Sequence, residues 1–227
     1  MTVTTDIFSL ETVYRLQILG LWFTQNNIPP LPSYPYGYFG GGEIPGPTPI
    51  STVDRIDYSN DTATASPKGP LSLAGGYLGA TSNQSYGYFG AGWYSTVDRI
   101  DYSNDTATAS VRGPLSRTVA HISATGNSSY GYLGGGFPGP VSTVDRIDYS
   151  NDTATALVRG PLSIGRHALA ATGNSSFGYF GGGSPTTSTV DRIDYSNDTA
   201  TASVRGPLSD ARSSLTATSA AANGLPQ

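Results

Sequence analysis

The chain has 227 residues, a net charge of −4 and no cysteine, and 12% of its residues are charged. This length suits one repeat domain with an appendage, and the missing cysteine excludes disulfides, thiol chemistry and sulfur-ligated metal sites. With Lys68 as the one lysine, the chain lacks the clustered cations that neutralise phosphates, so we expect no nucleic-acid partner.

Residues 1–35 form an N-terminal segment that belongs to no repeat. The segment has no basic start followed by an apolar run and a small-residue cleavage site, so we expect no secretory signal peptide and synthesis in the cytoplasm. Its apolar stretch, residues 13–23, is interrupted by Arg15 and Gln17 and is too short to span a bilayer. Four prolines near its end predict a stiff linker to the repeats.

The N-terminal segment also carries large apolar side chains that are unsuited to solvent. They are Leu16, Ile18, Leu21, Trp22 and Phe23. Two interpretations stay open: these side chains pack beneath the repeat domain, or they form an anchor that docks into a larger assembly. The secondary structure of the segment is open too, because its pattern fits both an alternating strand and a helical stripe.

The rest of the chain, residues 36–227, consists of four repeats. The segment STVDRIDYSNDTATA occurs in copies that begin at Ser51, Ser95, Ser142 and Ser188, which are 44, 47 and 46 residues apart. Each copy follows an aromatic–glycine string, such as YGYFGGG from Tyr36, and precedes the motif GPLS. A period of this size is typical of propellers and solenoids.

Each repeat contains four short runs that favour β-strands. In the last repeat they are a small apolar run ending at Gly173, the aromatic run 177–180, STVDRID from Ser188, and TATASVR from Thr199. Gly-Asn and YSND between the runs predict tight turns, because Asn and Asp can bond to their own backbone. The repeats show no helical periodicity, so the sequence predicts an all-β domain.

The repeat resembles the kelch motif over residues 36–219. The shared features are a glycine doublet after an aromatic strand, a valine-containing strand that ends in Asp, and Pro-Leu followed by Arg; in the last repeat they are Gly181-Gly182, Val190, Asp194, Pro207, Leu208 and Arg212. The family's tryptophan is replaced by Ala63, Ala107, Ala154 and Ala200, and the arginine is present only as Arg166 and Arg212. The resemblance implies one four-stranded propeller blade per repeat, with packing that depends on the Tyr/Phe strand.

The strand count predicts how the propeller closes. The first repeat lacks the small apolar strand, whereas the chain ends with an unpaired one, residues 211–220. We therefore expect this C-terminal strand to complete the first blade and close a four-bladed ring. Closure would pair the backbone N–H and C=O groups that edge strands leave free. The alternative is an open array, or a ring completed by neighbouring chains.

Acidic residues recur in every repeat and are candidate ligands for a hard cation. They are Asp54, Asp57 and Asp61 with their copies at 98, 101 and 105, at 145, 148 and 152, and at 191, 194 and 198. The set lacks the spacing of a dedicated calcium loop, and an arginine lies between the acids. Turn formation and Asp–Arg pairing in each blade explain four near-identical copies better, so we expect no metal or other cofactor.

Catalytic patterns are absent. His121 and His167 have no Ser or carboxylate partner suggested by the sequence, and the copper-radical centre of kelch-propeller oxidases requires a cysteine. We therefore expect a non-enzymatic protein. Most tyrosines suit a core, whereas the loops after the glycines differ between copies, which is typical of binding loops. The candidate binding residues in these loops are Trp93, Tyr94 and Phe137.

Repeated DRIDYSNDTATA segments resemble those of bacteriophage virion proteins, especially tail-fibre-like proteins. The resemblance implies a structural protein of the virion, anchored by residues 1–35, that binds a host-surface glycan or protein or decorates the shell. Its partners would be other virion proteins and further copies of the chain. A cellular kelch-type scaffold that binds another protein is the alternative, and a propeller enzyme is a third.

Overall fold

The computed structural model describes residues 35–219. The chain divides into two units, Met1–Ser33 and Tyr34–Gln227, and the described residues lie in the second. They form five small antiparallel sheets and contain no α-helix, only a 3-10 turn at Tyr195–Asn197, so the all-β prediction is confirmed. The predicted anchor lies outside the described residues: Leu16, Ile18, Leu21, Trp22 and Phe23.

The second, third and fourth repeats each form a four-stranded antiparallel sheet whose strands follow chain order. The second repeat contains β6 (Leu78–Ser82), β7 (Tyr86–Ala91), β8 (Val97–Asp101) and β9 (Ser110–Arg112). The third contains β10 (Ser123–Gly126), β11 (Tyr130–Gly134), β12 (Val144–Asp148) and β13 (Leu157–Arg159). The fourth contains β14 (Ala170–Gly173), β15 (Phe177–Gly181), β16 (Val190–Asp194) and β17 (Ser203–Arg205).

The predicted fourth strand is shorter than expected, because its TATA portion belongs to a turn. The N–H of Ala107 donates to the carbonyl oxygen of Asn104 at 3.2 Å, and pairing starts only at Ser110. The short Asn and Asp side chains before this point favour turn geometry over an extended ladder.

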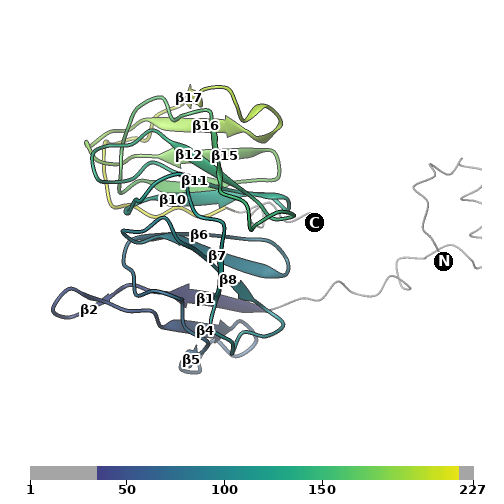
Figure 1. Ribbon diagram of the computed structural model, residues 1–227. Coiled ribbons are helices and arrows are strands. Elements are labelled where there is room, and N and C mark those ends of the chain that lie inside the picture. Colours follow the sequence, from purple (N-terminus) through teal and green to yellow (C-terminus); the bar gives the residue numbers. More distant parts are fainter. Residues whose placement is uncertain (1–34, 220–227) are drawn as a thin grey trace, which may run out of the picture. The chain divides into compact units, whose positions relative to one another are not determined.

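The first repeat forms a sheet of only three strands, β1 (Tyr36–Gly40), β4 (Val53–Asp57) and β5 (Ser66–Pro67). Its loop adds a separate hairpin, β2 (Glu43–Ile44) and β3 (Thr48–Pro49). The innermost strand is therefore missing from this sheet among the described residues, as predicted. Figure 1 shows the sheets following one another from β1–β4–β5 at one end to β14–β17 at the other.

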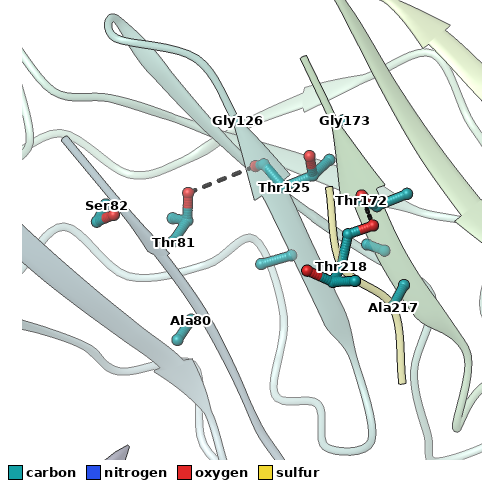
Figure 2. Close-up of a pocket in the computed structure, with 11 residues that line it drawn as sticks. Ala80, Thr81, Ser82, Thr125, Gly126, Thr172, Gly173, Ala217 and Thr218 are labelled. Atoms are coloured by element: carbon teal, nitrogen blue, oxygen red, sulfur yellow. Dashed lines mark hydrogen bonds between the residues drawn. The ribbon is translucent and has the colours of Figure 1, made fainter. Parts of the chain in front are cut away.

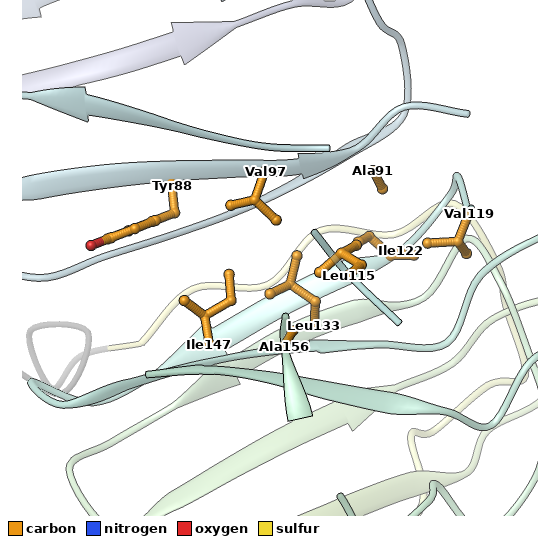
Figure 3. Packing of buried hydrophobic residues seen from close by; sticks show 9 residues of the cluster. All are labelled: Tyr88, Ala91, Val97, Leu115, Val119, Ile122, Leu133, Ile147 and Ala156. Carbon is orange, nitrogen blue, oxygen red and sulfur yellow. The ribbon is translucent and has the colours of Figure 1, made fainter. Parts of the chain in front are cut away.

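The hydrophobic core lies between successive sheets, not inside one repeat. Figure 3 shows one such core, in which Tyr88 and Val97 of the second repeat face Leu133 and Ile147 of the third. Two further clusters join the first repeat to the second and the third to the fourth. Because each sheet buries its faces only against its neighbours, the array is held together by nearest-neighbour contacts.

The predicted closure of the ring is wrong for the described residues. Residues 211–219 bond to the fourth repeat: the N–H of Arg212 donates to Thr187, and Thr172 Oγ1 donates to the carbonyl oxygen of Thr218 at 2.9 Å. No described residue of this segment pairs with β1. The linker after each sheet leads to the inner strand of the next sheet, so this C-terminal segment lies where the inner strand of a fifth sheet would be, although it forms no strand itself.

Candidate functional site: an aromatic and histidine patch

The predicted acidic residues have three structural roles. The aspartate after the valine accepts from the preceding linker: the N–H of Ser72 donates to Asp98 Oδ2 at 2.8 Å. The first aspartate of each DYSND forms the turn: Asp101 Oδ1 accepts hydrogen bonds from the N–H and hydroxyl of Ser103 at 2.9 and 2.6 Å. These bonds lower the pKa of Asp101. The last aspartate binds the preceding repeat, because Arg99 Nη1 lies 2.7 Å and the Tyr88 hydroxyl 2.9 Å from Asp152 Oδ2.

The expected Asp–Arg pairing is thus present, but it joins neighbouring repeats rather than parts of one repeat. The same contact recurs for Arg55 with Asp105 and for Arg146 with Asp198, each at 2.7 Å. A second cation reinforces each pair; at Asp152 it is Arg112, at 3.6 Å. We call this set of contacts the junction.

Each junction also includes stacked tyrosines and close backbone packing. Tyr88 stacks on Tyr149 of the next repeat with ring centroids 4.8 Å apart. Burial, followed by the hydrogen bond to Asp152, raises the pKa of Tyr88 well above its usual range. The N–H of Gly113 donates to the carbonyl oxygen of Asp152 at 2.8 Å. The acidic sets are therefore occupied by protein partners at the three internal junctions.

A different cluster has the character of a binding surface. We call it the aromatic patch, and its members are Tyr77, Trp93, His121, Phe137 and His167. The Tyr77 and His121 rings stack with centroids 3.9 Å apart, and Trp93 meets both His121 and Phe137 edge-on at 5.8 Å. His167 completes the patch, 5.9 Å from His121 and 5.4 Å from Phe137.

The patch is accessible despite its internal packing. Tyr77 is 46% exposed, Trp93 43% and Phe137 37%, while both histidines are half-buried. Large aromatic side chains that remain this accessible next to one another are typical of recognition surfaces.

The backbone at the patch has an unusual conformation that fixes these rings. Tyr77, Trp93 and His121 have φ angles of 61°, 74° and 55°, in the left-handed region that non-glycine residues seldom adopt. Hydrogen bonds between successive linkers hold this geometry: the N–H of His121 donates to Tyr77 and that of Ala168 to His121, both at 3.0 Å. Ala168 and Ser214, at the equivalent linker position, have φ angles of 50° and 56°, so this conformation belongs to the repeat and presents a different side chain from each copy.

Comparing the repeats with one another shows that the patch lies at positions that vary. The residue after each glycine string differs in all four copies: Glu43, Trp93, Phe137 and Ser184. The residue before each inner strand differs as well: Tyr77, His121, Ala168 and Ser214. The nearly constant repeat core therefore presents a different side chain from each copy along one rim, and variable side chains on a fixed scaffold suit selective binding.

Polar groups border the patch. The Tyr77 hydroxyl donates to Glu43 Oε2 at 3.1 Å, and this carboxylate raises the pKa of Tyr77. Burial and the neighbouring His167 lower the pKa of His121, which favours its neutral imidazole. A neutral imidazole offers one hydrogen-bond donor and one acceptor, which suits a hydroxyl-rich ligand.

Two of the three predicted binding residues are thus brought together. Trp93 and Phe137 are in the patch, whereas Tyr94 pairs through its backbone with Val119 and makes no ring contact within the described residues. Sequence reasoning overlooked Tyr77 and considered His121 and His167 only as catalytic residues, not as part of a binding surface. One sequence feature could have identified Tyr77 and His121 as binding residues: both occupy the position before the inner strand in their repeats.

Two grooves accompany the inner strands. One, of about 340 Å³, borders the patch between Tyr77, His121, Ala168 and Ser214. The other, of about 230 Å³, lies among the far ends of β6, β10 and β14 and residues 217–218 (Figure 2). Threonine, serine, alanine and glycine line it, and Thr81 Oγ1 donates to the carbonyl oxygen of Thr125 at 3.5 Å.

Within residues 35–219, no helix has the length and apolar character needed to cross a membrane. The same range contains no group of three or more His, Asp or Glu side chains placed to hold a metal ion. Neither a protein-family model nor a curated protein matches the sequence.

Proposed function

We propose that the chain is a non-enzymatic binding protein whose aromatic patch recognises a surface glycan. The observation that carries this proposal is the exposed, mutually packed set of Tyr77, Trp93 and Phe137 beside two histidines. Flat aromatic faces contact the C–H faces of sugar rings, while imidazole, phenol and carboxylate groups at the edge pair with sugar hydroxyls.

We further propose that each sheet is a kelch-like blade in an open array, displayed on a bacteriophage particle. The support is the resemblance of the repeated DRIDYSNDTATA segments to virion proteins, together with the apolar side chains of residues 1–35, which suit docking to other particle proteins. One shallow patch binds weakly, and display of many copies multiplies its strength. A cellular kelch-type scaffold that binds a protein is the competing proposal.

Trp93→Ala tests the glycan site. We expect the variant to fold normally and to lose affinity for host-surface polysaccharide by about tenfold or more, since a central tryptophan commonly contributes at least about 1.4–2 kcal/mol to binding. Retention on immobilised host polysaccharide and a glycan array measure the change. The matched control is Tyr94→Ala, which removes a similarly exposed neighbour that makes no ring contact with the patch. Equal binding by both variants and the unaltered chain would refute the site.

Deleting residues 1–28 tests the display proposal. Purified phage particles should contain the full chain in fixed stoichiometry and lack the deleted form, because the apolar anchor residues are gone while the repeats stay intact. Quantitative mass spectrometry of particles measures both. Incorporation of the deleted chain at normal copy number would contradict the role of the anchor. Absence of the full chain from all particles would favour the cellular scaffold.

A further inference from the structure

The two ends of the array expose complementary halves of the junction. At the first repeat, Asp61 is exposed, whereas its counterparts Asp105, Asp152 and Asp198 are each about 7% exposed. Phe39 is 63% exposed, compared with 7% for Phe89 in the second repeat. We call this surface the head face; it comprises Phe39, Asp54, Tyr58 and Asp61.

At the fourth repeat, no described residue covers the opposite half of the junction; Arg205 and Gly206 are exposed, and Tyr179 and Arg192 are half-buried. Its members are Tyr179, Arg192, Arg205 and Gly206, which we call the tail face. Within residues 35–219, neither arginine has a carboxylate partner within ion-pair distance, although the equivalent Arg146 and Arg159 both contact Asp198. Tyr179 likewise lacks the stacking partner that Tyr132 has in Tyr195, while Tyr58 on the head face is 61% exposed.

Gly206 gives an independent measure of the open tail face. The equivalent glycines of the first three repeats, Gly69, Gly113 and Gly160, lie so close to the next repeat that a Cβ would overlap its backbone. A Cβ on Gly206 would have nothing within 4 Å. The tail face therefore keeps the shape of a junction surface that no residue of the described range 35–219 covers.

The tail face also carries an additional segment, residues 211–219, in the position of an inner strand. Thr172 bonds to Thr218 as Thr81 bonds to Thr125, and Gly182 lies against Leu215 as Gly135 lies against Leu169. Residues 211–219 thus occupy the position of the inner strand of a fifth sheet, although they form no strand themselves and no further described strand lies beside them.

The first sheet, by contrast, lacks an inner strand, because β1 has no such partner among the described residues. The sequence positions that correspond to β6 in the first repeat are 28–32, IPPLP. Three of these five residues are prolines, which lack the N–H that a paired strand requires. An inner strand for β1 is therefore best supplied from elsewhere.

We propose that the tail face and residues 211–219 of one chain bind the head face of a second copy. The C-terminal segment adds to β1 as its inner strand, with Ala217 opposite Phe39 by the register of Ala171 with Phe180. Arg192 and Arg205 then pair with Asp61 of the second copy, and Arg212, equivalent to Arg166, reaches Asp54 as Arg166 reaches Asp191 at 2.9 Å.

The contact is head-to-tail, so it leaves a free head and a free tail on every pair. Such heterologous contacts give closed rings where the rotation closes and filaments where it does not. The three internal junctions show that this sequence already forms the contact with buried charge pairs, stacked tyrosines and a hydrophobic core. The inference concerns assembly and does not depend on the ligand of the aromatic patch.

Gly206→Val is the sharpest test, because the added side chain meets no described residue of its own chain but would overlap the docked copy. We expect the unaltered full-length chain to form concentration-dependent oligomers in sedimentation velocity, and Gly206→Val to raise the dissociation constant by about hundredfold or more. Its thermal midpoint, measured when both are dilute and monomeric, should be unchanged. Ser128→Val, at an exposed turn of the third repeat, is the control and should assemble normally. A monomeric unaltered chain, or equal assembly of Gly206→Val, would overturn the proposal.

A cross-linking experiment distinguishes binding to a second copy from closure within one chain. The chain has no cysteine, so Phe39→Cys and Ala217→Cys can be introduced singly, in chains with different tags. We expect mild oxidation of the mixture to give a disulfide-linked heterodimer, whereas Val111→Cys, also exposed on β9, should not cross-link to Ala217→Cys. If the mixture yields no heterodimer and the double variant Phe39→Cys/Ala217→Cys cross-links only within monomers, the proposal is wrong.

Discussion

Asp152→Ala is expected to lower the free energy of unfolding by about 3–5 kcal/mol, because it removes the shared partner of one internal junction. Arg99 and Arg112 would stay largely buried without a carboxylate, and the Tyr88 hydroxyl would lose its acceptor. Urea unfolding at low protein concentration measures the change. The isosteric variant Asp152→Asn should have a smaller effect, since its amide oxygen still accepts hydrogen bonds.

The chain contains its own control for this prediction. Asp61 has the same local sequence as Asp152 but no partner within the described residues, so Asp61→Ala should change the stability of the monomer by less than about 0.5 kcal/mol. A large loss for Asp61→Ala in the monomer, or a negligible loss for Asp152→Ala, would show that the aspartate acts within its own turn instead of between repeats.

Gly113→Ala is expected to destabilise the fold by about 3 kcal/mol or more, because one methyl group cannot be accommodated there. The added Cβ would overlap the carbonyl oxygen of Ala154, and a backbone atom cannot rotate away as a side chain can. The two repeats would have to separate, which disrupts the hydrogen bonds and the core at that junction. Thermal and urea unfolding measure the loss.

Gly206→Ala is the matched control for Gly113→Ala, since it makes the same change in the same motif where nothing lies within 4 Å. Its midpoint in the dilute monomer should equal that of the unaltered chain or rise slightly, because alanine restricts the unfolded backbone more than glycine does. Equal destabilisation at both positions would mean that the GPLS glycine is needed for its own conformation and not for close approach.

The elements of one repeat could be predicted from sequence, and their partners could not. Alternation, glycines and Asx turns give the aromatic strand, the VDRID strand and the turn at Asp101, because those depend on neighbours in the chain. The partner of Asp152 is Arg99, 53 positions away, and an arginine of identical context lies within its own repeat. Since the copies have the same local sequence, pattern alone does not decide which arginine each aspartate meets.

Ring closure and the aromatic patch were beyond sequence reasoning for related reasons. Closure depends on the rotation from one sheet to the next, which results from packing at the junctions, and a strand count carries no information about it. The patch joins side chains from three repeats, and only Trp93 and Phe137 belong to the loops that variability identified. Tyr77 and His121 occupy a linker position that holds small residues, Ala168 and Ser214, in the other two copies, so the position has no recurrent aromatic pattern.

The junctions are nearly identical, with Lys68 in the first where the others have Arg112 and Arg159, and this similarity affects how such a gene can change. Near-identical coding segments recombine unequally, so copies are readily gained and lost, and most proteins would not fold after such an event. Here an inserted or deleted copy meets its new neighbours through the same aspartate, arginine and glycine, so the longer or shorter product has every internal contact satisfied. Each added copy also contributes new side chains at the rim, so the length of the array and its binding preference can vary together within a population.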